Sequence, residues 1–237
     1  VFDLPFMMRG AQGTSRAVWE WVQANDQAEF KGVHPIAFHV HGPGVFHMAK
    51  RPIRTLADFS GVTLRAPTPP MHRLFALFGA TPAAMPLPQV PEALSKGVIE
   101  GAAIPWEIVP ALKVQESVKF HSETDPSQPA LYTSSFIFAM NQAKYDSLPL
   151  DMKRVIDANS GADTSAWVGK VFAEGDIPGR KASEANTFNM IPAAEIENWK
   201  KVAQPLLDEW VKNATARGLN GSALLDSARS LIDKYKK

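Results

Sequence analysis

Short apolar runs alternate with helix-like stretches between residues 50 and 106, and this alternation constrains the fold more than any other feature of the chain. An extended run at 62–66 precedes a helix-like stretch that ends near Gly79. A second extended run follows, and a helical stretch at 88–96 ends at Gly97 and leads into a third. Strands and helices that alternate in this way stack as α/β layers, so we predict an α/β fold.

Apolar periodicity predicts further elements on both sides of this segment. The predicted strands are 34–41, 118–121, 132–140 and 187–191, and the predicted helices are 14–27, about 149–174, 196–211 and one from about 222. Gly161 lies inside the long helix predicted from 149 and weakens it, while Pro205 should bend or split the helix that contains it. Glycine and proline at 42–44, and two prolines at 126–129, are candidate crossings between two α/β lobes.

Charge and composition exclude several classes of function. The 237 residues carry a formal net charge of +1, and basic residues gather only in the short tail 234–237, so there is no nucleic-acid footprint. No apolar run approaches the roughly 18 residues of a membrane-spanning helix, so we expect no direct membrane insertion. The absence of cysteine removes disulfides, thiolate nucleophiles and sulfur-ligated metals.

Arg65 is the first candidate for ligand binding. An arginine presents a planar fork of donors that matches a carboxylate, and its charge does not titrate away. At the end of a strand in an α/β lobe it should face the crevice where ligands bind. The alternative is a surface arginine, or a partner for Glu92 or Glu100.

Trp106 is the second candidate, because it follows a predicted strand and begins a helix. Its ring could pack on a flat or branched ligand, or it could be a core or interlobe packing residue. Four histidines gather within residues 34–47, and His41 or Phe46 could line a cleft at the lobe crossing. Their spacing does not supply the convergent ligands of a zinc site, so we predict no metal.

Catalytic motifs are missing from the sequence. It contains no nucleophile elbow, no zinc-protease helix and no phosphate-binding loop. We therefore predict no catalytic residues and no cofactor.

The order and spacing of several short motifs resemble the extracytoplasmic solute-binding proteins of TRAP transporters, of the dicarboxylate-receptor type. The shared patterns are Asp-Leu-Pro-Phe at 3–6, Leu-Ala-Asp-Phe-Ser-Gly at 56–61, Gly-Val-Thr-Leu-Arg-Ala-Pro at 61–67, Gly-Ala-Thr-Pro at 79–82 and the stretch 145–149 ahead of a long helix. The resemblance implies a two-lobed periplasmic-binding-protein-like fold, joined by hinge strands and a lobe-spanning helix. Lobe one is then expected at 1–42 and 131–170, and lobe two at 43–130 and 171–237.

The resemblance also implies roles for individual residues. In the family, the arginine of the Gly-x-x-x-Arg-x-Pro pattern clamps the carboxylate of the ligand, and this arginine is Arg65 here. Ile104 replaces an asparagine that is common in the family, and Leu87 falls near a position that is often apolar or aromatic. The stretch 44–47 around Phe46 lacks a second arginine that some members carry. These departures favour a monocarboxylate with an apolar or aromatic side, such as a 2-oxo, 2-hydroxy or aromatic acid.

The function expected from the resemblance is that of a periplasmic receptor. It binds a small organic acid, closes by hinge motion and delivers the acid to the membrane permease subunits. The opening D-x-P-F segment normally follows further strands and helices of lobe one, so we expect an N-terminal portion to be missing. Two alternatives stay open, namely an enzyme that acts on a carboxylic acid and a sensor that passes its ligand to a signalling partner.

Overall fold

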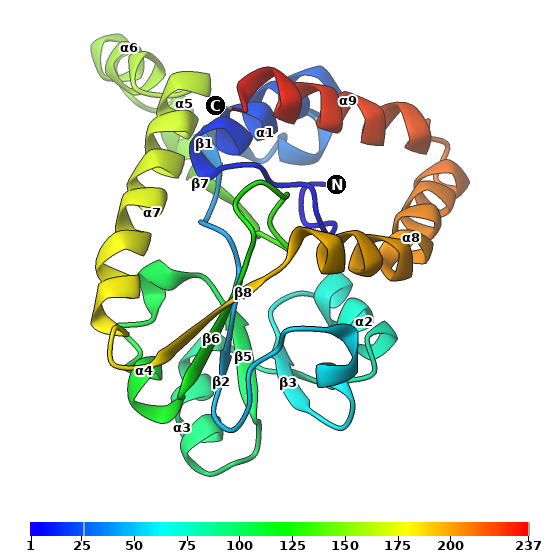
Figure 1. Cartoon of the computed structure of the whole chain (residues 1–237). Coiled ribbons are helices and arrows are strands. Elements are labelled where there is room, and N and C mark those ends of the chain that lie inside the picture. The colour runs from blue at the N-terminus through cyan, green and yellow to red at the C-terminus, as the bar shows by residue number, and fades with distance from the viewer. Residues whose placement is uncertain (26, 237) are drawn as a thin grey trace.

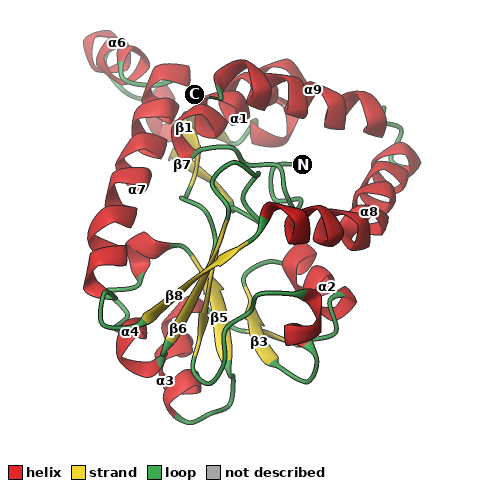
Figure 2. Cartoon of the chain, viewed as in Figure 1, coloured by secondary structure: helices red, strands yellow, loops and turns green. Residues whose placement is uncertain are grey.

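The computed structural model describes every residue except 26 and 237, and it shows a mixed α/β chain in two lobes (Figures 1 and 2). Within the described residues the strands form two sheets, one of six strands and one of two. The six-stranded sheet lies in the lower lobe of Figure 1, and the two-stranded sheet lies in the upper lobe. The predicted two-lobed α/β fold is confirmed.

The lower sheet has the strand order β4-β3-β5-β2-β6-β8. Its strands are β2 (Val45–Met48), β3 (Thr63–Ala66), β4 (Thr81–Ala84), β5 (Gly101–Ile104), β6 (Phe120–Thr124) and β8 (Thr187–Ile191). Strand β3 runs parallel to β4 and β5, as the strand–helix alternation predicts, whereas β2 runs antiparallel to β5 and β6. The helices of this part are α2 (Pro69–Leu77), α3 (Val90–Ser95), α4 (Val114–Ser117) and α8 (Ala193–Ala216), with short 3-10 turns η2 (Leu56–Phe59), η3 (Leu87–Gln89) and η4 (Trp106–Ile108).

Local sequence explains where α2 and α3 begin and end. The Thr68 side chain accepts a hydrogen bond from the backbone N–H of Met71, and Pro69 occupies the first turn of α2, where its missing N–H costs nothing. Gly79 follows α2 and Gly97 follows α3, both with positive φ (92° and 69°) that a side chain would strain. These signals set β3, β4 and β5 side by side.

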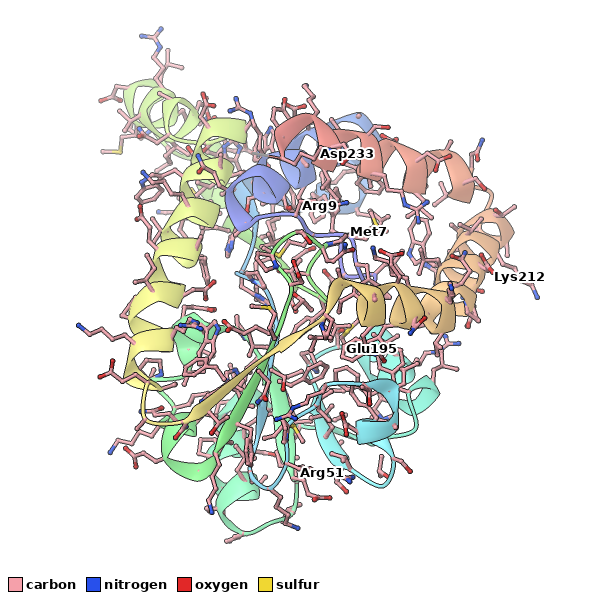
Figure 3. The ribbon with its side chains drawn as sticks, in the orientation of Figure 1. Met7, Arg9, Arg51, Glu195, Lys212 and Asp233 are labelled. Atoms are coloured by element: carbon pink, nitrogen blue, oxygen red, sulfur yellow. The ribbon has the colours of Figure 1, made fainter. Side chains whose placement is uncertain are left out.

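An aromatic cluster forms the core between the sheet and α8. Trp199 packs against Phe46, Phe59 and Phe78, with ring centroids 6.1, 5.3 and 5.3 Å away. Its indole N–H donates to Glu195 Oε1 at 2.8 Å, and the same oxygen accepts the backbone N–H of Leu56 at 2.8 Å. Glu195, labelled in Figure 3 at the start of α8, therefore ties that helix to η2. Helix α8 remains one element although Pro205 lies inside it, and its ribbon bends part-way along in Figure 1.

The upper lobe is built on β1 (Val33–Val40) and β7 (Ser135–Asn141), which pair antiparallel with Phe38 opposite Ile137. Its helices are α1 (Ala11–Asn25), α5 (Gln142–Asp146), α6 (Leu150–Ala158) and α9 (Gly221–Tyr235), with the 3-10 turn η1 (Gln27–Phe30). Helix α9 packs on α1, and the Trp21 indole N–H donates to Leu224 O at 3.0 Å. The C-terminal helix therefore shares the core of the upper lobe, although the expected division places all of 171–237 in lobe two.

Helix α7 (Ala162–Ala182) runs from the upper lobe to the lower lobe along the left edge of Figure 1. A side chain at Gly169 would collide with Ala11 O, and one at Gly179 would collide with Trp106 O, so glycine lets the helix touch both lobes closely. The prediction of one long helix from 149 is wrong. Helix α6 ends at Ala158, and Gly161 with φ of 112° separates it from α7.

Candidate functional site

Arg65 lies on β3, between β4 and β5, and is only 7% exposed. Its Nη1 donates to Ala103 O at 3.1 Å, and its Nε donates to Met85 O at 3.5 Å. Burial lowers its pKa from the ordinary arginine value. Among the residues that the structure describes, no carboxylate lies within ion-pair distance of this guanidinium.

The two acids considered as partners of Arg65 pair with lysines instead. Glu92 contacts Lys96 at 2.5 Å, one helical turn away, and Glu100 contacts Lys50 at 3.5 Å. The site therefore holds a buried positive charge with capacity left for a ligand anion.

Tyr132 lies beside this charge and was not singled out by sequence reasoning. It is 1% exposed, and its ring packs so closely on Gly44 that a Cβ there would lie 1.9 Å from the ring. The hydroxyl has no hydrogen-bond partner within residues 1–25 and 27–236. Burial raises the pKa of Tyr132, and the charge of Arg65 acts against that rise. No short motif marks such a residue, because its importance depends on what surrounds it in the fold.

A carboxyl pair joins α7 to η4. The backbone N–H of Glu107 donates to Asp176 Oδ1 at 3.1 Å, and a Cβ on Gly42 would collide with the Asp176 carboxylate. Burial, and then the charge of Asp176, raise the pKa of Glu107 to about 8. Burial also raises the pKa of Asp176. At neutral pH the pair therefore shares one proton, which Glu107 carries. A protonated carboxyl can donate a hydrogen bond to the ionised carboxylate beside it.

His41 occupies the crossing between β1 and β2. Its Nδ1 donates to Gly42 O at 2.5 Å, and its Nε2 accepts the backbone N–H of Ser134 at 3.1 Å. Burial lowers its pKa to about 4, so the ring is neutral at pH 7. Both ring nitrogens are engaged in holding the crossing segments together, and the ring edge faces Tyr132 at a centroid distance of 5.5 Å.

The remaining predicted ligand residues have mostly internal contacts. Phe46 packs in the aromatic core against Phe59 and Phe75, and Ile104 is buried in a separate apolar cluster. Leu87 is half-buried on η3, at the margin of the same cluster. Ligand contact by these side chains stays a prediction.

Trp106 is enclosed by lower-lobe residues. Its indole N–H donates to Glu123 Oε1 at 2.9 Å, and its ring contacts His47 and His121 with centroids 4.8 Å away in each case. These contacts match the core alternative, and ligand contact by Trp106 also stays a prediction.

The other histidines are dispersed through the fold. His34 stacks on Tyr145 at 3.6 Å between centroids, and His39 lies between Phe136 and Phe172. The described part of the chain holds no group of three or more histidine, cysteine, aspartate or glutamate side chains placed to bind a metal.

His47 and His121 form a buried chain of hydrogen bonds across the lower sheet. His47 Nε2 donates to Ile104 O at 3.1 Å, the two Nδ1 atoms are 2.7 Å apart, and His121 Nε2 accepts from Asn186 Nδ2 at 3.0 Å. These partners require the proton between the rings to be on His121. Burial lowers the pKa of His47 to about 3 and that of His121 to about 4, so both rings are neutral.

A pocket of about 460 Å³ lies beside the carboxyl pair, between the crossing segments and the end of α7. Its lining includes Asp176, Trp106, Arg180 and Arg9, which Figure 3 labels below α1. Arg180 already pairs with Glu123 at 3.1 Å, so this pocket offers less unpaired charge than Arg65. None of the helices described here is sufficiently long and apolar to cross a bilayer.

The sequence model of the bacterial extracellular solute-binding proteins, family 7, matches residues 1–213. The fold is similar to that of a TRAP solute-binding protein from Rhodoferax ferrireducens T118 in complex with copurified benzoate, which is 48% identical, with a TM-score of 0.96 over 99% of this chain and 73% of that chain. A marine metagenome TRAP solute-binding protein specific for aromatic acid ligands, in complex with 3-hydroxybenzoate, is 38% identical, with a TM-score of 0.95 over 100% of this chain and 74% of that one.

Curated sequences give a more distant match. The outer membrane transporter protein TsaT of Comamonas testosteroni is 25% identical over 97% of this chain and 68% of its own length. The chain spans 52% and 65% of two further curated relatives.

Proposed function

The chain belongs to the bacterial extracellular solute-binding proteins of family 7, and on that premise we propose that it is the receptor that delivers a small organic acid to the membrane permease of a TRAP transporter. Family membership makes it a solute-binding protein that works outside the cytoplasm, and not an enzyme. The alternative of an enzyme on a similar scaffold is therefore set aside.

The observation that carries this proposal is the buried, unpaired charge of Arg65. A guanidinium that is removed from water and lacks a counter-ion costs free energy, and an entering carboxylate recovers it through charge-assisted hydrogen bonds. The carbonyl oxygens of Ala103 and Met85 fix the orientation of the fork before the ligand arrives. We propose that Arg65 binds the ligand carboxylate in this way.

We further propose that the ligand is a monocarboxylate with an apolar or aromatic side. Arg65 is a single cation, and positions 87 and 104, which follow its carbonyl partners Met85 and Ala103 in the chain, carry leucine and isoleucine. The Rhodoferax protein holds benzoate and the marine protein holds 3-hydroxybenzoate, which supports an aromatic acid here. A ligand with two carboxylates needs a second cation for its other end.

Closure of the two lobes over the ligand is the mechanism that we propose. Exclusion of water strengthens the ion pair of Arg65 with the carboxylate. The ligand favours closure only to the extent that it binds the closed form more tightly than the open form. Helix α7 and the crossing segments beside Gly42 and Gly44 connect the two lobes and set the path of that motion.

Titration calorimetry with benzoate, succinate and a hexuronate tests the proposal. We expect benzoate to bind, and Arg65→Ala to weaken it about 100-fold, because hydrogen bonds to a charged group are lost. Arg51→Ala is the matched control, since Arg51 is exposed near the foot of the lower lobe in Figure 3 and donates to Ser60 O. Tight binding of succinate or the hexuronate without any binding of benzoate would refute the proposed ligand class.

A further inference from the structure

Two buried donors at the lobe junction lack a matching acceptor. The guanidinium of Arg65 has five N–H groups, and its hydrogen bonds in the structure go to two backbone carbonyls. The Tyr132 hydroxyl is enclosed, and among the residues described it has no partner at all. Buried tyrosines ordinarily hydrogen-bond their hydroxyl, so this one needs an explanation.

The surroundings of Tyr132 hold its ring in place. Gly44 lies against one side of the ring, and the backbone N–H of Gly44 donates to Tyr132 O at 3.1 Å. The ring of His41 meets it edge to face. The hydroxyl therefore cannot swing toward solvent without displacing the crossing segments, and it remains within electrostatic reach of Arg65.

One ligand group satisfies both donors. A carboxylate has two oxygens and about four acceptor positions, so it can accept from a guanidinium and a phenol together. A neutral acceptor, such as an amide carbonyl, satisfies the hydroxyl but leaves the charge of Arg65 without a counter-ion. The unpaired hydroxyl of Tyr132 and the unpaired charge of Arg65 therefore match an anionic ligand and not a neutral one.

We propose that the Tyr132 hydroxyl donates a hydrogen bond to the same ligand carboxylate that Arg65 binds, which makes Tyr132 a second ligand-binding residue. The inference rests on the proposed function, because it assumes that the ligand is a carboxylic acid. The Tyr132 hydroxyl then contributes to ligand affinity and not to folding.

The nearby carboxyl group of Glu107 is compatible with this anion. Its Oε2 is buried and, within the described chain, has no hydrogen-bond partner. Because Glu107 is held in its protonated form at neutral pH, it adds no negative charge that repels the ligand. The negative charge of the pair resides on Asp176, which accepts from the backbone N–H of Glu107.

Tyr132→Phe in the full-length protein tests the inference with benzoate as the probe. The substitution removes one oxygen and keeps the ring against Gly44. We expect benzoate affinity to fall about 10-fold, as for the loss of one hydrogen bond to a charged group. We expect the thermal midpoint without ligand to stay the same or rise, because an unpaired buried hydroxyl is removed. Tyr145→Phe is the control, since the half-buried Tyr145 donates its hydroxyl to Asp157 Oδ1 at 2.7 Å.

The outcomes separate the two proposals. If benzoate binding depends on Arg65 but is unchanged in Tyr132→Phe, the role of Tyr132 is refuted and the proposed function stands. If Tyr132→Phe lowers the thermal midpoint of the free protein and leaves affinity unchanged, the hydroxyl is structural and the inference is wrong. If the wild-type protein binds no aromatic or aliphatic carboxylate, both proposals fall together.

Discussion

The two sheets of the molecule differ in how much of their apolar surface their own lobe covers. In the lower lobe, helices α2, α3 and α8 close over the six-stranded sheet, and Trp199 at its core is 0% exposed. In the upper lobe, β7 presents Phe136, Ile137 and Phe138 to solvent, the last of them 60% exposed. Further exposed apolar side chains lie on α6 and α7, namely Leu150, Met152, Val155, Trp167, Val171 and Ile177.

This difference separates a lobe that covers most of its apolar side chains from a lobe that leaves many of them exposed. Soluble proteins rarely expose large contiguous apolar patches without a covering partner, and an open strand edge can pair with another strand. We therefore expect substitutions in the core of the lower lobe to lower the free energy of unfolding strongly. Substitutions of the exposed apolar side chains of the upper lobe should lower it little unless a partner covers them.

The largest expected effect comes from Trp199→Ala. Removing a fully buried tryptophan leaves a cavity among Phe46, Phe59 and Phe78, and we expect a loss of about 3–5 kcal/mol in the free energy of unfolding. Trp167→Ala is the matched control, because Trp167 is 64% exposed on α7 and should cost less than about 0.5 kcal/mol. Denaturant unfolding measures both. Equal losses would mean that the upper face is covered in solution, and the comparison would fail.

The histidine chain of the lower sheet should give the next effect. His47 and His121 have pKa values of about 3 and 4 in the folded protein, below the ordinary value of 6.5. Between the folded pKa values and 6.5, the unfolded chain binds more protons than the folded protein. The free energy of unfolding is therefore at its full value above pH 6.5 and falls as the pH drops toward 4. We expect a loss of about 2–4 kcal/mol over that window.

This pH dependence is tested by measuring the free energy of unfolding at several pH values for the wild-type protein, His121→Gln and His72→Gln. His121→Gln should flatten the slope because one buried titrating ring is removed, whereas His72→Gln, half-exposed on α2, should keep it. An unchanged slope in His121→Gln would place the acid sensitivity elsewhere.

Glu107, at the junction of the two lobes, should make a smaller contribution to the pH dependence of the free energy of unfolding, with the opposite sign. Its pKa is about 8 in the folded protein and near 4.5 in the unfolded chain, so its stabilising contribution is full below pH 4.5 and is lost as the pH rises through 8. Solvent reaches part of this residue, so we expect about 1–2 kcal/mol. Glu107→Gln should abolish this slope, and Glu116→Gln, exposed on α4, should leave it unchanged. A slope that persists in Glu107→Gln would contradict the assignment.

The smallest effect on stability is expected for Phe138→Ser. This side chain is exposed on β7, so the free energy of unfolding should change by less than about 0.5 kcal/mol. Self-association of this chain, measured by sedimentation, should decrease because the apolar face becomes smaller. A stability loss above about 2 kcal/mol would show that Phe138 is buried in solution.

The sequence predicted the parts of the fold that depend on local signals. Gly79 and Gly97 were recognised as helix ends from the sequence, and Arg65 was placed correctly on its strand. The break at Gly161 was predicted as a weakness but not as an end. A glycine within a helical pattern does not by itself reveal that its φ is positive.

The site was predictable only in part, for the same reason. Arg65 stands in a recognisable motif, whereas Tyr132 stands in none and packs on Gly44, 88 positions earlier in the chain. Likewise, Glu107 and Asp176 are 69 positions apart, and no periodicity connects them. Residues whose chemistry depends on a distant partner become visible only when the chain is folded.

Helix α7 has a mechanical consequence for the motion proposed between the lobes. Pro178 lacks the N–H that would bond to Glu174 O, and Gly175 and Gly179 flank it within one turn of Asp176. The stiff first part of the helix is fixed to α1, so the compliant turn lies where α7 meets η4. If the lobes rotate against each other as proposed, strain should concentrate at this turn, beside the carboxyl pair.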